Sequence, residues 1–124
     1  MEQIKDSGSR TEFSTGAVRD AQTGEKGAFD LLPMYALYKV ARVFEDGGKK
    51  YQKHNWRKGI PLSRYADSAM RHLAKAIAGF TDEPHYSQAA WNILCLIETK
   101  YMIESGKLPK ELDDLPDFTG KDWY

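Results

Sequence analysis

The sequence has little with which to cross-link itself or to attract a charged polymer. It contains one cysteine, Cys95, and its 18 Lys and Arg residues are balanced by 18 Asp and Glu residues. A lone cysteine cannot form an internal disulfide. A net charge of zero provides no field that would steer the chain toward DNA, RNA or an anionic membrane. We therefore expect no long nucleic acid as a partner.

Long apolar runs are also missing. The longest uncharged stretch that leans apolar, residues 86–97, is too short to span a bilayer and is interrupted by Ser87, Gln88 and Asn92. The sequence does not open with a positively charged segment followed by an apolar one, the pattern of a secretory signal. These absences predict a cytoplasmic protein without a membrane segment.

Regular alternation of apolar and polar residues, the pattern of a half-buried strand, is not sustained anywhere in the sequence. Internal repeats and the motifs of Rossmann, P-loop and zinc-binding proteins are absent as well. Three segments instead carry helical spacing. The sequence therefore predicts an all-α fold: a small bundle of three main helices with an irregular N-terminal arm and an irregular C-terminal tail.

The first helix is expected to begin within residues 30–33, where Asp30 can cap it and Pro33 suits a first turn. We expect it to end at Gly47 and Gly48, because each glycine inside a helix costs about 1 kcal/mol relative to alanine.

The second helix is expected to follow Pro61 and to carry one continuous apolar face until Gly79 ends it. The third is expected over residues 85–104, with Gly106 just beyond its end. Both end signals are of the kind that stops a helix, and the second helix is the clearest element of the sequence.

We divide the chain into three parts. Residues 1–28 are rich in Gly, Ser, Thr and charge, and we expect a flexible or docked arm. Residues 29–106 form the helical domain, and residues 107–124 an irregular tail whose Trp123 and Tyr124 are candidates for docking. Three helices flanked by two irregular segments bury little apolar surface alone, so we expect a homo-oligomer.

The connection between the first two helices, residues 49–61, combines positive charge with aromatic rings. It contains Lys49, Lys50, Tyr51, Lys53, His54, Asn55, Trp56, Arg57 and Lys58. Cations, aromatic faces and an amide are what a site needs to hold phosphate and stack a base. The alternative is a solvated basic loop whose Tyr51 and Trp56 pack on the core.

The second helix has a polar face that suits phosphate, since its members follow i, i+4, i+7 and i+11 spacing. They are Arg64, Ser68, Arg71 and Lys75. His72, at the edge of the apolar face, is a candidate general base, and the alternative is a half-buried core histidine. Asp67 and Arg71 are also placed for an ordinary i, i+4 salt bridge.

The third helix places His85, Gln88 and Asn92 on one face, because positions i, i+3 and i+7 return to nearly the same direction. Asn92 stands among apolar neighbours, and its burial without a partner would cost about 1–3 kcal/mol. We expect its amide to bond either another helix or a ligand. Cys95, inside an apolar run, is expected to be a buried core residue.

Carboxylates are available for a divalent cation but are not grouped in the sequence. Hard cations such as Mg²⁺ prefer oxygen ligands, usually one or two carboxylates together with substrate phosphates. The candidates are Glu45, Asp46, Asp67, Asp82, Glu83, Glu98 and Glu104. Their spacing does not show which of them converge.

Several of these segments together resemble a phage and prophage family described as dATP/dGTP diphosphohydrolase-like, which is related to the all-α MazG-like nucleotide pyrophosphohydrolases. They read FDLLP at 29–33, VFEDGGKKY at 43–51, NW at 55–56, PLSRY at 61–65, MRHL at 70–73, and His85 followed by AAWN at 89–92. The stretch EFSTGAVRD at 12–20 resembles the one that often precedes them.

The resemblance implies hydrolysis of a purine deoxynucleoside triphosphate to the monophosphate and pyrophosphate, with Mg²⁺ or Mn²⁺ bridging the phosphates and water as the nucleophile. It implies a nucleotide as partner, and the host cytoplasm as location if a phage encodes the chain. The implied substrate-binding residues are Lys50, Tyr51, Asn55, Trp56, Arg71 and Asn92. The implied catalytic residues are His72, Asp67 and His85. The implied pool of metal ligands is Glu45, Asp67, Asp82 and Glu98.

MazG-like enzymes carry Glu-x-x-Glu on one helix and Glu-x-x-Asp on the next, and neither motif stands in this sequence. Either the metal site is built differently, with histidines helping, or the chain is a non-catalytic protein that binds or sequesters a nucleotide or nucleotide signal, such as a phage counter-defence sponge. A further alternative is an interaction module that uses the arm and the Trp123–Tyr124 tail.

Overall fold

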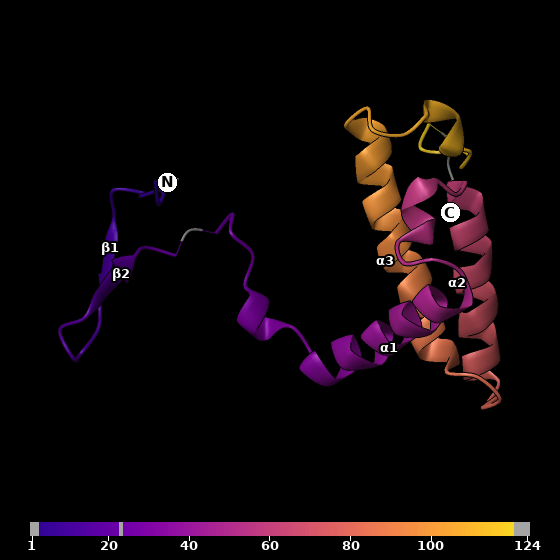
Figure 1. Ribbon diagram of the computed structural model, residues 1–124, viewed down its shortest axis with the longest axis horizontal. Coiled ribbons are helices and arrows are strands. Elements are labelled where there is room, and N and C mark those ends of the chain that lie inside the picture. The colour runs from indigo at the N-terminus through magenta and orange to yellow at the C-terminus, as the bar shows by residue number, and fades with distance from the viewer. Residues whose placement is uncertain (1–2, 23, 121–124) are drawn as a thin grey trace. The chain divides into compact units, whose positions relative to one another are not determined.

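The computed structural model describes residues 3–22 and 24–120 of the 124-residue chain (Figure 1). The chain divides into two compact units, residues 1–33 and residues 34–124. The predicted docking of Trp123 and Tyr124 lies outside the described residues.

The first unit contains a short β-hairpin, so the prediction of an N-terminal arm without regular structure is wrong at this point. Strand β1 (Arg10–Glu12) pairs antiparallel with β2 (Val18–Asp20), and Arg10 lies opposite Asp20. The turn is closed by Phe13 N–H, which donates to the Ala17 carbonyl at 2.8 Å. The 3-10 helix η1 (Phe29–Leu31) follows. Strands of three residues are too short to produce visible alternation, which explains why the sequence pattern missed them.

The second unit begins with α1 (Met34–Lys50), and both predicted ends of this helix are wrong. It starts after Pro33, and it continues through Gly47 and Gly48. The ring of Phe44 packs on Trp56 and Trp91, with centroid distances of 6.2 and 5.6 Å. This tertiary packing holds the last turns in place despite the glycines, whose combined propensity cost is about 2 kcal/mol.

Helices α2 (Leu62–Ile77) and α3 (His85–Glu104) confirm the two later predicted helices. Gly79 and Gly106 adopt φ values of 93° and 81°, the left-handed conformation that commonly ends a helix. Figure 1 shows α2 and α3 side by side and antiparallel, with α1 lying across them. The chain is thus a mostly helical small protein.

The buried core between these helices contains Leu62, Tyr65, Cys95 and Ile103. Cys95 is therefore a core residue, as predicted, and burial raises its thiol pKa to about 12. The opposite side of α3 remains apolar as well: Ile97 and Tyr101 are more than half exposed. Within the described residues, no helix combines the length and apolar character that crossing a membrane requires.

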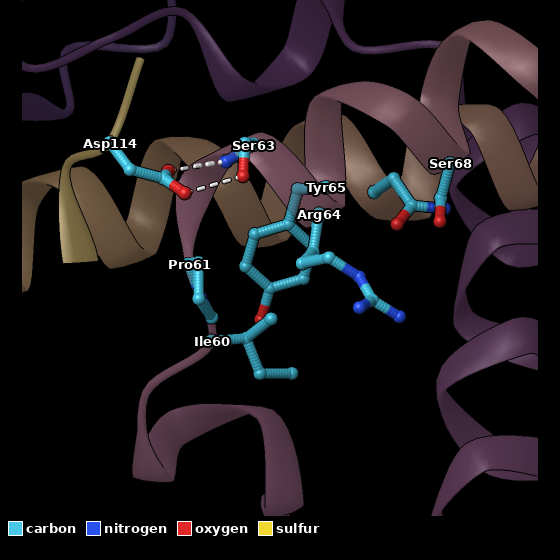
Figure 2. A pocket seen from close by; sticks show the side chains of 8 residues that line it. Ile60, Pro61, Ser63, Arg64, Tyr65, Ser68 and Asp114 are labelled. Atoms are coloured by element: carbon cyan, nitrogen blue, oxygen red, sulfur yellow. Dashed lines mark hydrogen bonds between the residues drawn. The ribbon is translucent and has the colours of Figure 1, made fainter.

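The tail docks on the helices through leucines and one aspartate. It contains the 3-10 helix η3 (Lys110–Leu112), and Leu108, Leu112 and Leu115 pack against the core. The Asp114 carboxylate accepts hydrogen bonds from the Ser63 N–H at 2.9 Å and the Ser63 hydroxyl at 2.5 Å, as Figure 2 shows. Asp114 thereby satisfies a free N–H at the start of α2, where a negative charge is also favoured.

Candidate functional site

A cavity of about 640 Å³ opens between the end of α1, the loop that follows it, and the facing sides of α2 and α3. This volume lies in the range of small-molecule sites, about 300–1,000 Å³. The loop contributes the 3-10 helix η2 (Asn55–Lys58). Six of the residues predicted to bind or act on a substrate line the cavity: Lys50, Tyr51, Asn55, Trp56, His72 and Asn92.

Aromatic rings form one part of the cavity wall. Trp56, Phe44 and Trp91 all line it and pack on one another. The Arg57 guanidinium lies 4.6 Å from the centroid of the Trp56 ring, and the Lys50 ammonium lies 5.2 Å from that of Tyr51. The alternative interpretation of the basic loop is thus correct in that Trp56 packs on the core, yet the same ring also faces the cavity.

The wall also carries charge of both signs. Asp46 and Lys50 come from the end of α1, Lys53 from the loop, and Glu83 from the turn between α2 and α3. Gly47 and Gly48 line the cavity without side chains, and a Cβ on Gly47 would meet no protein atom within 4 Å. Gly47 and Gly48, which lie inside α1, therefore leave space for a ligand in the cavity.

Two histidines and an aspartate form a hydrogen-bonded chain at the cavity edge. Nε2 of His85 lies 2.8 Å from Oδ1 of Asp82, and Nδ1 of His85 lies 3.0 Å from Nδ1 of His72. His85 is only 2% exposed, whereas His72 lines the cavity. A carboxylate only accepts, so His85 donates from Nε2; with one hydrogen on each ring, Nδ1 of His85 accepts from Nδ1 of His72.

With one hydrogen on each ring, this chain places the hydrogen of His72 on Nδ1 and leaves Nε2 unprotonated. Nε2 has no hydrogen-bond partner among the residues that the structure describes. Burial is the main cause that lowers the pKa of His72, and the nearby His85 lowers it further. The hydrogen bond from His85 lowers the pKa of Asp82, which keeps that carboxylate ionised. A neutral imidazole with a free ring nitrogen can accept a proton.

Among the residues that the structure describes, the Asn92 amide bonds its own helix and no other. Its Nδ2 donates to the Gln88 carbonyl of the same helix at 2.8 Å, and the residue is 6% exposed. Gln88 in turn donates to Glu83 Oε1 at 3.2 Å. Of the three residues that the spacing placed on one face, Gln88 and Asn92 line the cavity, whereas the buried His85 is not among the lining residues.

Asp67 and Arg71 are not among the residues that line the cavity. They form the predicted salt bridge, with Nη1 of Arg71 2.6 Å from Oδ2 of Asp67. Arg71 also donates from Nη2 to the Ser68 hydroxyl at 3.2 Å. Arg71 thus forms an ion pair with a carboxylate on the same helix.

The four predicted metal ligands lie in different surroundings. Glu45 lies 2.8 Å from Arg42 and 3.5 Å from Lys49, and Glu98 lies 3.6 Å from Arg57. Across residues 3–22 and 24–120, one group of three residues has the spacing to hold a metal ion, with ligand atoms within 4.8 Å of one another. It consists of Asp82, Glu83 and His85. Asp82 is therefore the predicted ligand that has suitable neighbours.

Residues of the site that the sequence analysis did not select include Trp91 and the glycines of α1. Trp91 carried a usable signal, because it directly precedes the selected Asn92. Glu83 and Gln88 were named in the sequence analysis, and both line the cavity.

A family model described as dATP/dGTP diphosphohydrolase, N-terminal, matches residues 17–107, which include every residue that lines the cavity. No curated protein and no solved structure matches the chain. The matched segment covers most of the 124 residues. The chain therefore belongs to the family described as dATP/dGTP diphosphohydrolase, N-terminal.

Proposed function

We propose that the chain binds a purine deoxynucleoside triphosphate in the cavity and hydrolyses it to the nucleoside monophosphate and pyrophosphate. The observation that carries this proposal is the placement of His72, with its free ring nitrogen, in the same cavity as aromatic rings and lysines. The family description, which names a dATP/dGTP diphosphohydrolase, supports the choice of substrate.

The end of α1 and the loop that follows it would bind the nucleotide. The faces of Trp56 and Tyr51 suit stacking with a purine base, and the Asn55 amide suits hydrogen bonds to base or sugar. Lys50 would pair with phosphate oxygens. All four residues line the cavity, so one ligand can reach them together.

His72 would act as the general base. Its Nε2 takes a proton from a water molecule while the water oxygen attacks the α-phosphorus. The bond between the α-phosphorus and the oxygen that bridges to the β-phosphate then breaks, and pyrophosphate leaves with the electron pair. His85 keeps the His72 ring oriented through the 3.0 Å contact between their Nδ1 atoms, and Asp82 orients His85.

The donor atoms beside this chain suit a divalent cation. Both ring nitrogens of His85 are already hydrogen-bonded, so the ligands would be carboxylate oxygens of Asp82 and Glu83, both of which are exposed. Two carboxylates plus phosphate oxygens are what Mg²⁺ or Mn²⁺ prefers. When bound, such a cation neutralises the charge of the phosphates.

A second candidate function is nucleotide binding without cleavage. It is favoured by the surroundings of Glu45, Asp67 and Glu98, each of which is paired with a basic side chain instead of joining a shared carboxylate cluster. A binding protein would use the same loop and the same aromatic rings but would not need His72 as a base.

One experiment separates the two functions. The purified chain is incubated with each deoxynucleoside and ribonucleoside triphosphate, with Mg²⁺, with Mn²⁺ or with EDTA, and the products are resolved by chromatography. We expect metal-dependent monophosphate from dATP or dGTP. Recovery of intact triphosphate from heat-denatured protein, with no monophosphate formed, would instead establish the binding protein.

We also propose that a second copy of the chain covers the exposed apolar side of α3, where Ile97 is 58% and Tyr101 52% exposed. An apolar helix face normally packs against a similar surface. Light scattering after gel filtration should give a multiple of the chain mass, and Ile97→Asp should shift it to the monomer. A monomeric wild-type chain would contradict this.

A further inference from the structure

A second hollow, of about 430 Å³, adjoins the cavity and is drawn in Figure 2. Ser68 and Asn92 line both spaces, so the two share part of one wall. On the other sides the hollow is lined by Ile60, Arg64 and Tyr65, among others. We call this space the Arg64 hollow.

Arg64 provides the positive charge of the hollow and forms no ion pair within the described residues. Asp114 also lines the hollow, and its carboxylate accepts two hydrogen bonds from Ser63, which lower its pKa and hold the negative charge at the start of α2. Burial raises the pKa of Tyr65 to about 12, against a smaller opposite effect of Thr99, so this phenol stays neutral.

Ser68 adds a hydrogen-bond donor at the shared wall. Its hydroxyl oxygen accepts a hydrogen bond from Arg71 at 3.2 Å. Because that bond uses the oxygen as acceptor, the hydroxyl hydrogen is left to donate elsewhere. In Figure 2 the Arg64 side chain extends toward the end of the hollow at which Ser68 lies.

The order of residues along α2 matches the direction in which a triphosphate would run. Arg64, Ser68 and His72 are spaced by four residues, about 6 Å of helix rise per step, and lie on nearly the same side of the helix. If the α-phosphorus lies at His72, the chain of phosphates can extend past Ser68 to Arg64. The guanidinium fork suits the oxygens of a terminal phosphate.

We propose that the Arg64 hollow is the subsite for the terminal phosphate and that Arg64 makes the chain select triphosphates over diphosphates and monophosphates. This inference rests on the proposed function, since it takes the base to lie at the aromatic part of the cavity. Arg71, although it was selected from the sequence, does not have this role, because it lines neither the cavity nor the hollow and forms an ion pair with Asp67.

The test compares the affinities of dGTP, dGDP and dGMP, measured by calorimetry in EDTA so that no turnover occurs. In the wild type, affinity should rise with each phosphate. Arg64→Gln should lower the affinity for dGTP by about tenfold, as expected for the loss of one charge-assisted hydrogen-bonded pair. The affinity for dGMP should stay within about twofold of the wild-type value. Arg64→Lys should restore part of the loss. Arg71→Gln, on the same face of α2, is the matched control and should keep the dependence on phosphate number.

An equal loss for all three nucleotides in Arg64→Gln, or no loss, would overturn the inference, as would a larger effect of Arg71→Gln on dGTP. Arg64 is exposed, so circular dichroism should show an unchanged fold. The outcome is separable from that of the proposed function. A wild type that forms monophosphate while Arg64→Gln behaves identically refutes the subsite alone, whereas a wild type that forms none refutes the hydrolase.

Discussion

The Nδ1 atoms of His72 and His85 face each other at 3.0 Å, so one hydrogen lies between them. Since Asp82 accepts the hydrogen on Nε2 of His85, that shared hydrogen belongs to His72 in the neutral pair. A carboxylate at the surface thus determines which nitrogen of His72 is free in the cavity. The account of catalysis depends on this relationship.

Substitution of the two histidines should affect turnover to different degrees. His72→Gln removes the proton acceptor and should lower kcat by about 10²-fold or more, the usual contribution of a general base. His85→Gln removes only the residue that orients His72, and a loss of about 10-fold is expected. KM for dGTP should change little in either variant. Equal kcat in His85→Gln and wild type, with unchanged folding, would rule out an orienting role.

The lowered pKa of His72 also predicts how stability depends on pH. The usual pKa of histidine is 6.5, and the pKa of His72 in the folded chain lies below it. At pH values between these two pKa values, the unfolded chain binds the proton more readily than the folded chain does. The stabilising contribution is therefore complete above pH 6.5 and is lost as pH falls through that interval. Glu83 opposes the shift only in part.

The measurement is the melting temperature as a function of pH for the wild type and for His72→Gln. Below pH 6.5 the wild type should lose stability more steeply than the variant, because only the wild type carries this group. Parallel curves would show that His72 has the same pKa in both states.

Gly47 can be used to separate helix stability from ligand space. Gly47→Ala should stabilise the chain by about 1 kcal/mol, because Gly47 is helical and the added Cβ meets no protein atom within 4 Å. Gly47→Leu, also a good helix former, should extend into the cavity and abolish tight dGTP binding without loss of stability. Urea unfolding and calorimetry give the two quantities. Tight dGTP binding by the Leu variant would mean that the ligand lies elsewhere.

Gly59 tests the docking of the tail. Its φ of 112° is strained for any other residue, and a Cβ there would lie 2.9 Å from Cδ1 of Leu112. Gly59→Ala should cost about 1–3 kcal/mol of unfolding free energy. Leu112→Ala should relieve the clash but not the backbone strain, so the double variant should lose less than the sum of the two single losses. Additive losses would indicate that Leu112 is not packed on Gly59.

The later two helices could be predicted from the sequence because local signals and packing agree there. Gly79 and Gly106 end helices in the conformation expected of them. Gly47 and Gly48 gave the same local signal, but the packing of Phe44 between two tryptophan rings overrode it. Ring packing between distant segments leaves no mark in a local pattern, so the end of α1 could not have been found in this way.

The site could be predicted only as a list of side chains. Residue type and spacing selected the loop residues Lys50 and Trp56, as well as His72 and Asn92, and these do line one cavity. The ion pair of Arg71 with Asp67 could also be predicted, from their i, i+4 spacing. The spacing could not show that Arg64, on the same polar face, lines a hollow beside the cavity, because the hollow depends on how the tail and α3 pack against α2.

The central claim is that the cavity cleaves a deoxynucleoside triphosphate between its α- and β-phosphates with His72 as the base. The most direct measurement is the ³¹P NMR spectrum of dGTP and of dATP during incubation with wild type and Mg²⁺, beside His72→Gln. We predict that monophosphate and pyrophosphate appear in equal amounts in the wild type and remain near background in the variant. Release of orthophosphate with the diphosphate, or equal rates in the two proteins, would contradict the account.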